Sequence, residues 1–217
     1  MILRACVLAL SLAVFGGGLT ACSGGSDQVA VFETKYGRIV VEFLPEYAPM
    51  HVEAFQGMIS SGSMDGTRFH RIIPGKIIQG GDPNSKDDDP SDDGLGQPGQ
   101  PTIPAEFTTA IKHTRGIVSA ARKGDNKDSA TSQFFVCLGD EPAYDGQYTI
   151  FGRVVDGMNV VGLIANAPTR RDDPKLRERP AEPVAIDRAY LTTRAALGLP
   201  AKTDEGMATN AAPSNRK

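Results

Sequence analysis

The chain has 217 residues, 40% of them hydrophobic and 23% charged, and a formal net charge of -3 at pH 7. This length suits one well-buried domain with appendages, and the composition is that of an ordinary water-soluble protein. A slightly acidic chain lacks the basic face that binds nucleic acid, so we exclude DNA and RNA as partners.

The N-terminus has the pattern of a bacterial export signal. Residues 1–4 form a short positive segment, and residues 6–15 are apolar. The apolar run is shorter than the ~20 residues of a membrane-spanning helix, so we interpret it as part of a signal peptide. Residues 19–22 have the sequence Leu-Thr-Ala-Cys and resemble the lipobox, in which the cysteine is diacylated and becomes the new N-terminus.

We therefore expect a lipoprotein signal peptide over residues 1–21 and a lipidated Cys22, followed by a flexible spacer over residues 22–28. The exported domain would be anchored by its lipid to the cell envelope, on the extracytoplasmic face of a membrane. An ordinary cleavable signal with a chance cysteine is the alternative. Cys137 would then be the one cysteine of the folded domain, which excludes an internal disulfide there. We expect it to be a buried strand thiol, because residues 134–138 are apolar.

The folded domain is expected to span residues 29–194. Two β-rich runs at residues 29–34 and 37–44 flank a short turn, which predicts a β-hairpin. A helix is expected next, with Pro49 in its first turn and Gly62 after its end. Apolar residues recur at helical spacing between these two: Val52, Phe55, Met58 and Ile59.

Short strand-like runs separated by turn signals occupy most of the remaining domain. They cover residues 68–73, 76–79, 116–121, 133–138, 148–154 and 185–191. One further helix is predicted, with Asp156 as its N-cap. Short strands without a βαβ rhythm favour an antiparallel sheet or a closed barrel, so the fold class is mainly β. Residues 195–217 have little periodicity, and we expect them to form a disordered tail.

Two loop motifs imitate ligand sites. Residues 94–99 match the glycine fingerprint of dinucleotide sites, but no strand precedes them and Pro98 interrupts them. The acidic loop at residues 87–93 contains the start of a calcium-loop pattern, yet Gln100 stands where a bidentate Glu is needed. We expect no nucleotide site, assign no metal ligand, and interpret the acidic loop as solvated, with calcium binding as its alternative.

The three histidines receive no catalytic role. We expect His51 on the solvent side of the first helix and His113 in a charged loop, neither with a partner that would make it a base or a ligand. His70 precedes Arg71, and adjacent strand residues point to opposite faces, so the two should not line one site. We interpret His70 as structural.

A cation, two side-chain amides and an aromatic ring stand out in two short stretches. The first, FHRIIPGKIIQGGD, contains Arg71 and Gln79; the second, SQFF, contains Gln133 and Phe135. Taken alone, Arg71 would be interpreted as a surface arginine and Phe135 as a core ring. Together, and without a nucleophile, they suit a reaction in which no covalent bond is made or broken.

These stretches resemble those of the cyclophilin family of peptidyl-prolyl cis-trans isomerases, and the resemblance covers residues 29–192. Residues 116–121 and 151–158 resemble further segments of that family. The resemblance implies a closed eight-stranded antiparallel β-barrel capped by two α-helices. It also implies that no cofactor is needed and that the partners are proline-containing polypeptides. We further expect the chain to be a monomer.

The resemblance implies roles for individual residues. Arg71 would be the catalytic arginine and Phe135 the wall of the proline pocket. Gln79 and Gln133 would anchor the peptide backbone. Substrate-binding positions are implied for a further set: Ile77, Ala121, Tyr144, Tyr148, Lys76 and Ala143.

Two of these positions depart from the family. Lys76 and Ala143 stand where many members have aromatic rings. Their loss should leave a more open groove, and we expect weakened cyclosporin binding.

The residue types suit isomerisation of an X-Pro bond. Resonance holds the peptide bond planar, so its rotation crosses roughly 18–20 kcal/mol. In the twisted transition state the prolyl nitrogen regains a lone pair, and a positioned donor such as Arg71 stabilises that form selectively. We therefore predict an isomerase that assists the folding of exported proteins. A non-catalytic binding module or chaperone that holds proline-containing peptides is the alternative.

Overall fold

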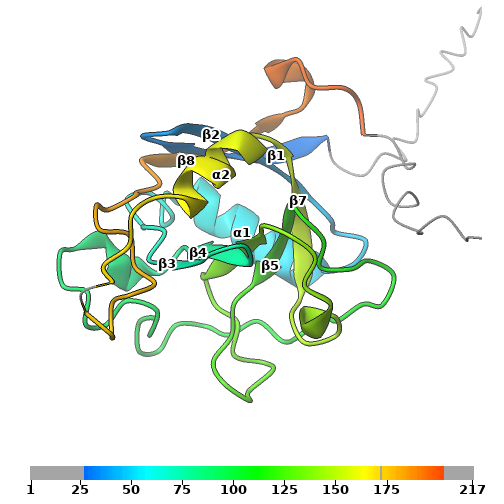
Figure 1. Cartoon of the computed structure of the whole chain (residues 1–217). Coiled ribbons are helices and arrows are strands. Elements are labelled where there is room, and N and C mark those ends of the chain that lie inside the picture. Colours follow the sequence, from blue (N-terminus) through cyan, green and yellow to red (C-terminus); the bar gives the residue numbers. More distant parts are fainter. Residues whose placement is uncertain (1–26, 172, 203–217) are drawn as a thin grey trace, which may run out of the picture.

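The computed structural model describes residues 27–171 and 173–202. Within these ranges, eight strands form one sheet with the order β3-β4-β6-β5-β7-β2-β1-β8, and two α-helices accompany it (Figure 1). The strands are β1 (Gln28–Thr34), β2 (Gly37–Phe43), β3 (Arg71–Ile73), β4 (Ile77–Gly80), β5 (Ile117–Ala120), β6 (Phe134–Cys137), β7 (Ile150–Asp156) and β8 (Arg188–Thr193). The α-helices are α1 (Pro49–Ser60) and α2 (Met158–Ala165), and short 3-10 helices η1 (Pro83–Lys86), η2 (Pro142–Tyr144) and η3 (Ala195–Leu197) lie in the connections.

The expected export features lie mostly outside the described residues. These are the signal peptide at residues 1–21, the lipidated Cys22 and the spacer up to residue 26. In the part of the chain that the structure describes, no helix combines the length and the apolar character needed to cross a membrane.

The N-terminal hairpin forms as predicted. β1 and β2 pair antiparallel from Val29 opposite Glu42 to Thr34 opposite Gly37. The hydroxyl of Thr34 donates to the Gly37 carbonyl over 2.9 Å and closes the turn. The hairpin then continues the sheet on both sides, because β1 pairs with β8 and β2 pairs with β7.

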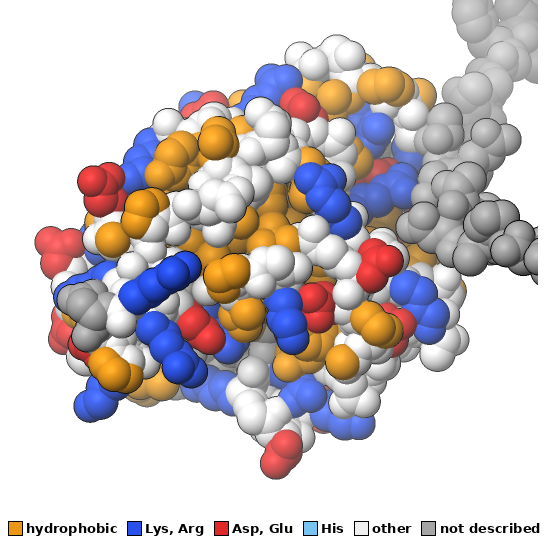
Figure 2. Space-filling model, viewed as in Figure 1, with side chains coloured by type: hydrophobic (Ala, Val, Ile, Leu, Met, Phe, Trp, Pro, Cys, Tyr) orange, Lys and Arg blue, Asp and Glu red, His pale blue; other side chains and the backbone are white. Residues whose placement is uncertain are grey.

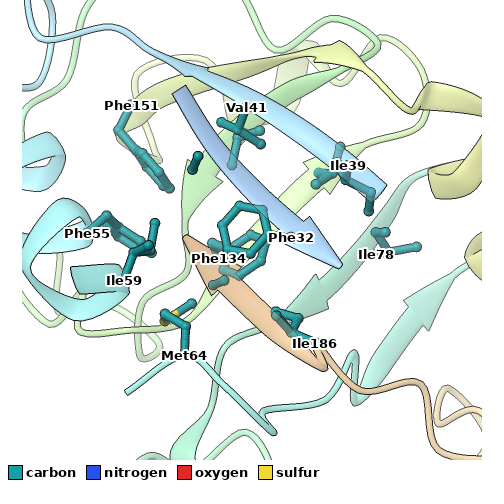
Figure 3. Close-up of a cluster of buried hydrophobic side chains, with 14 of the residues drawn as sticks. Phe32, Ile39, Val41, Phe55, Ile59, Met64, Ile78, Phe134, Phe151 and Ile186 are labelled. Atoms are coloured by element: carbon teal, nitrogen blue, oxygen red, sulfur yellow. The ribbon is translucent and has the colours of Figure 1, made fainter. Parts of the chain in front are cut away.

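Aromatic rings fill the interior of the sheet. Phe32 of β1 stacks on Phe134 of β6 at 5.4 Å, and Phe55 of α1 stacks on Phe151 of β7 at 4.1 Å (Figure 3). Each of these rings is less than 5% exposed, and burial of one such ring contributes about 2–3 kcal/mol. α2 adds Val160, Val161 and Ile164 to the same core. One hydrophobic core therefore joins the sheet and both helices.

The barrel closes through isolated pairs rather than a continuous ladder. β3 and β8 end the strand order, and neither pairs with the other. The segments that precede them meet instead: the amide of Phe69 donates to the Val184 carbonyl over 2.9 Å, and that of Ile186 to the Thr67 carbonyl over 2.8 Å. The eight antiparallel strands are confirmed, whereas the expected closure is discontinuous. The predicted strand at 68–73 is correspondingly regular only from Arg71.

α2 begins one residue later than expected. Its N-cap is Gly157, with φ of 89°, while Asp156 is the last residue of β7 and pairs with Arg38 at 3.1 Å. A Cβ at residue 157 would lie 2.3 Å from the Arg38 carbonyl oxygen. The close approach of β2 therefore requires glycine here, and the prediction of Asp156 as N-cap was wrong.

The chain beyond β8 is folded as far as residue 202, where the described range ends. Leu197 and Leu199 pack against the buried valines of β1 and β2. The Arg194 side chain donates from Nε to the Pro200 carbonyl over 2.7 Å. The expectation of a disordered tail from residue 195 was wrong for residues 195–202, and residues 203–217 lie outside the described ranges.

Candidate active site

Three polar side chains form a row across neighbouring strands. Arg71 of β3 lies opposite Gln79 of β4, so both point to one face of the sheet. Arg71 donates from Nη1 to the Gln79 Oε1 over 3.3 Å, and Gln79 donates from Nε2 to the Gln133 Oε1 over 3.0 Å. The predicted cation and both amides are therefore connected by hydrogen bonds.

Gln133 is fixed from behind by a buried carboxylate. Its Nε2 donates to the Asp82 Oδ2 over 3.2 Å and to the Gly94 carbonyl over 3.0 Å. Asp82 is fully buried and also accepts from the amides of Gly94 and Gly96. No role was predicted for Asp82, although its place before Pro83 marks it as a cap of η1.

Phe135 supplies an apolar wall on the same face, because it lies opposite Gln79 in the β4–β6 pair. Its ring is 3% exposed and meets Tyr144 and Tyr148 edge to face at 5.6 and 5.3 Å. Edge-to-face packing adds to simple burial, so the wall is rigid.

His113 lies in a loop, as expected, but it is buried and has a partner, which was not expected. Its ring is 2% exposed and stacks on Phe135 at 6.2 Å. Nδ1 lies 3.0 Å from the Asp145 Oδ1, which also accepts from the His113 amide. Burial lowers the pKa of His113, and Asp145 opposes part of that shift. The ring is therefore a neutral support for the wall near pH 7.

His51 also differs from the expectation. It is fully buried in α1, and its Nδ1 lies 2.6 Å from the Glu106 Oε2. The Glu106 carboxylate accepts from the amides of Met50 and His51, and so caps the helix N-terminus from a distant loop. Burial lowers the pKa of His51 despite this carboxylate.

The row and the wall border a cavity of about 400 Å³. Seven of the ten predicted catalytic and substrate-binding residues line it: Arg71, Ile77, Gln79, Ala121, Phe135, Tyr144 and Tyr148. Gln133 lies beside it and lines a smaller hollow that shares Gln79 and Ala121 with the main cavity. His70 lines the cavity together with Arg71, so the argument from strand alternation was wrong. The reason is that β3 begins only at Arg71, and His70 precedes the regular strand.

Lys76 and Ala143 do not line the cavity. Lys76 is exposed in the turn between β3 and β4, where its amide donates to the Ile73 carbonyl over 3.0 Å. Ala143 is exposed in η2. Neither is among the residues that line the cavity itself, and their part in substrate binding stays a prediction.

Part of the cavity lining comes from a segment for which no role was predicted. Residues 168–181, which we call the strap, connect α2 to the approach of β8; residue 172 is outside the described ranges. Lys175, Leu176, Glu178 and Arg179 of the strap line the cavity. In Figure 1 the strap is the yellow to orange hairpin at the lower left, and Figure 2 shows Lys and Arg side chains gathered in that region.

The strap meets the site through two ion pairs. Glu178 Oε2 accepts from the Arg71 Nε over 2.7 Å. Arg179 pairs with Asp93, whose side chain is 4% exposed. The acidic loop is therefore not wholly solvated as expected, because Asp93 turns inward to meet the strap. Among the described residues, no three His, Cys, Asp or Glu side chains are grouped as metal ligands.

This arrangement can bind a small apolar ring of a peptide against Phe135. It can also place the guanidinium of Arg71 beside the peptide bond next to that ring. In the described part of the chain, the Nε and Nη1 of Arg71 have acceptors and Nη2 has none, so Nη2 is available to a ligand in the cavity that Arg71 lines. A fixed cation beside an apolar wall stabilises charge that develops on a bound peptide.

Comparison with known proteins agrees with this geometry. The family described as "Cyclophilin type peptidyl-prolyl cis-trans isomerase/CLD" matches residues 29–191. A "Probable peptidyl-prolyl cis-trans isomerase" of Brucella abortus is 37% identical over 164 residues, which are 74% of this chain and 81% of the relative. A Schizosaccharomyces pombe peptidyl-prolyl cis-trans isomerase is 38% identical over 162 residues, with 72% and 94% covered.

Solved structures show the same fold. A Cryptosporidium parvum cyclophilin, crystallised in the presence of the dipeptide Ala-Pro, superposes with a TM-score of 0.65 at 27% identity. The match covers 76% of this chain and 99% of that one. The chain therefore belongs to the cyclophilin family and is a peptidyl-prolyl cis-trans isomerase.

Proposed function

We propose that this isomerase acts on exported proteins and that Arg71 is its catalytic residue. The catalytic role is supported by the position of Arg71, which borders the cavity and whose guanidinium donates hydrogen bonds to Gln79 and Glu178. Its Nη2 has no acceptor among the described residues, and Phe135 lines the same cavity.

The proposed mechanism uses the lone pair that appears on the prolyl nitrogen as the bond twists. A proline ring packed against Phe135 keeps one side of the bond still, and the amides of Gln79 and Gln133 bind the backbone on the other side. The Arg71 guanidinium then donates to the prolyl nitrogen in the twisted form. Because neither planar isomer offers this acceptor, the contact lowers the barrier in both directions. The pyramidal nitrogen becomes planar again as the bond completes its turn, and no proton is transferred.

Proline-limited refolding of a test protein measures this function. We expect the wild type to accelerate the slow refolding phase, and Arg71→Ala to lose about 10²-fold in kcat/KM, as when one charge-stabilising donor is removed. Arg115→Ala is the matched control, because Arg115 is an exposed arginine outside the cavity. Absence of acceleration by the wild type would favour the non-catalytic binding module. An Arg71→Ala variant as fast as the wild type would exclude Arg71 as the catalytic residue.

The proposal of an exported, lipid-anchored enzyme is supported by the N-terminal sequence, in which an apolar run precedes the Leu-Thr-Ala-Cys tetrad that ends at Cys22. We expect mass spectrometry of the mature protein to find a diacylated cysteine as its first residue. Cys22→Ser should abolish incorporation of a labelled fatty acid. Incorporation that persists in Cys22→Ser would contradict the anchor. That the chain works as a monomer, and that it binds cyclosporin weakly, stay predictions.

A further inference from the structure

We propose that Glu178 of the strap is a positioning residue for Arg71, which rests on the catalytic role proposed for that arginine. Glu178 lies 107 residues further along the chain than Arg71, and its carboxylate is 2.7 Å from the Arg71 Nε. Both side chains are about two-fifths exposed, at 43% for Arg71 and 38% for Glu178. Without a fixed partner, an arginine with this exposure samples several rotamers.

The two contacts of the guanidinium involve different nitrogens. Glu178 accepts from Nε, and Gln79 accepts from Nη1 at the longer distance of 3.3 Å. The shorter, charge-assisted bond is the stronger of the two. The group cannot turn about its Cδ–Nε bond or swing away from the cavity without breaking at least one of them. Glu178 therefore restricts the guanidinium to an orientation that leaves Nη2 available to a bound substrate.

The strap holds Glu178 in place by contacts that do not involve its carboxylate. The amide of Ile72 in β3 donates to the Glu178 carbonyl over 2.6 Å. At the base of the strap, Thr169 and Pro180 form an isolated bridge, and the amide of Ala181 donates to the Pro168 carbonyl over 2.7 Å. The backbone of residue 178 should therefore stay in place when its side chain is replaced, so a variant tests the carboxylate alone.

A carboxylate beside a catalytic cation has a second, opposite effect. Its negative charge weakens the field that Arg71 presents to the prolyl nitrogen. If this effect dominated, removal of the charge would accelerate the enzyme. If orientation dominates, as we propose, loss of the contact slows it, because the donors must find the nitrogen from a wider set of rotamers.

Two substitutions separate these effects. Glu178→Gln keeps an acceptor oxygen and removes the charge, whereas Glu178→Ala removes both. We expect Glu178→Ala to lose about tenfold in kcat with KM nearly unchanged, well short of the 10²-fold of a 1 Å misplacement. Glu178→Gln should retain at least half of the wild-type kcat. Glu182→Ala is the matched control. Glu182 is an exposed glutamate next to the strap, and it pairs with Lys35 at 3.4 Å and not with Arg71.

NMR relaxation of the Arg71 side chain tests the same role without measuring enzyme activity. The Nε–Hε group of Arg71 gives an NMR signal that Arg71→Lys identifies by its absence. We expect the order parameter of this group to fall in Glu178→Ala and to stay at the wild-type value in Glu178→Gln and Glu182→Ala.

The outcomes distinguish this inference from the proposed function. An unchanged order parameter in Glu178→Ala, or a kcat equal to or above that of the wild type, would overturn the positioning role. A Glu178→Gln variant as slow as Glu178→Ala would overturn it as well, since the acceptor alone would then be insufficient. An inactive wild type would contradict the proposed catalysis instead, while the NMR signal would still report whether Glu178 orders Arg71.

Discussion

Burial determines how His70 responds to pH. The side chain is 7% exposed, and burial lowers its pKa from 6.5 to about 4, although Asp82 opposes the shift. The unfolded chain then binds a proton at a pH where the folded chain does not. This contribution to stability is complete above pH 6.5 and is lost as the pH falls towards 4.

The stability of the wild type should therefore fall below pH 6.5 more steeply than that of His70→Phe, which fills the same buried site with a ring that does not titrate. At pH 4.5 we expect His70 to account for about 2–3 kcal/mol of the loss relative to pH 7. Urea unfolding of both proteins at the two pH values measures the difference. The other groups that titrate are common to both proteins, so equal losses in the two would exclude His70 as a source of acid sensitivity.

The sequence predicts the residues that line the site better than the residues that hold them in place. Arg71, Gln79 and Phe135 come from two stretches with a specific order, and antiparallel pairing places them on one face. Glu178 contacts Arg71 across 107 residues and belongs to no periodic element, so local pattern carries no signal for it. The carboxylate partners of His51 and His113 are likewise distant in sequence, and the expectation that neither ring has a partner failed for that reason.

Among the elements, the start of α2 depends on one glycine. Gly157→Ala should cost at least about 2 kcal/mol, because φ of 89° strains an L-residue and the new Cβ would meet the Arg38 carbonyl. Gly162→Ala, within the same helix, has no atom within 4 Å of its Cβ and should be neutral or stabilise by about 0.5–1 kcal/mol. Thermal unfolding of the two variants measures the contrast. Similar costs at both positions would contradict the close contact between α2 and β2.

The sequence predicts the end of a strand or helix correctly where a turn or cap signal lies beside it in the sequence. The β1–β2 hairpin and the start of α1 at Pro49 follow from such signals. β7 and β8 each lie two or three residues later than their apolar runs suggested. The ends of these strands are determined by the strands with which they pair. The last residues of β7 pair with β2, and β8 pairs with β1. Pairing between distant strands is not visible in a single apolar run.

At the scale of the whole molecule, the segment after β8 packs against the sheet. Lys202 lies 3.7 Å from Glu42, a 2% exposed carboxylate that also pairs with Arg153 at 2.8 Å. Truncation after residue 194 would remove this contact together with Leu197 and Leu199. We expect it to destabilise the protein by about 2 kcal/mol relative to truncation after residue 202, mainly through lost apolar burial. Equal urea midpoints for the two truncated proteins would contradict a stabilising role for residues 195–202.

The discontinuous closure of the barrel also bears on aggregation. A sheet that ends in a free strand offers its outer amides and carbonyls to any extended chain, and such edges nucleate aggregation. An isomerase meets flexible polypeptides as substrates, so an open edge beside its active site would be a hazard. The strap contacts this edge, where its residue 178 carbonyl accepts from the Ile72 amide of β3. The segment that borders the cavity thus also helps to prevent a substrate from joining the sheet as one more strand.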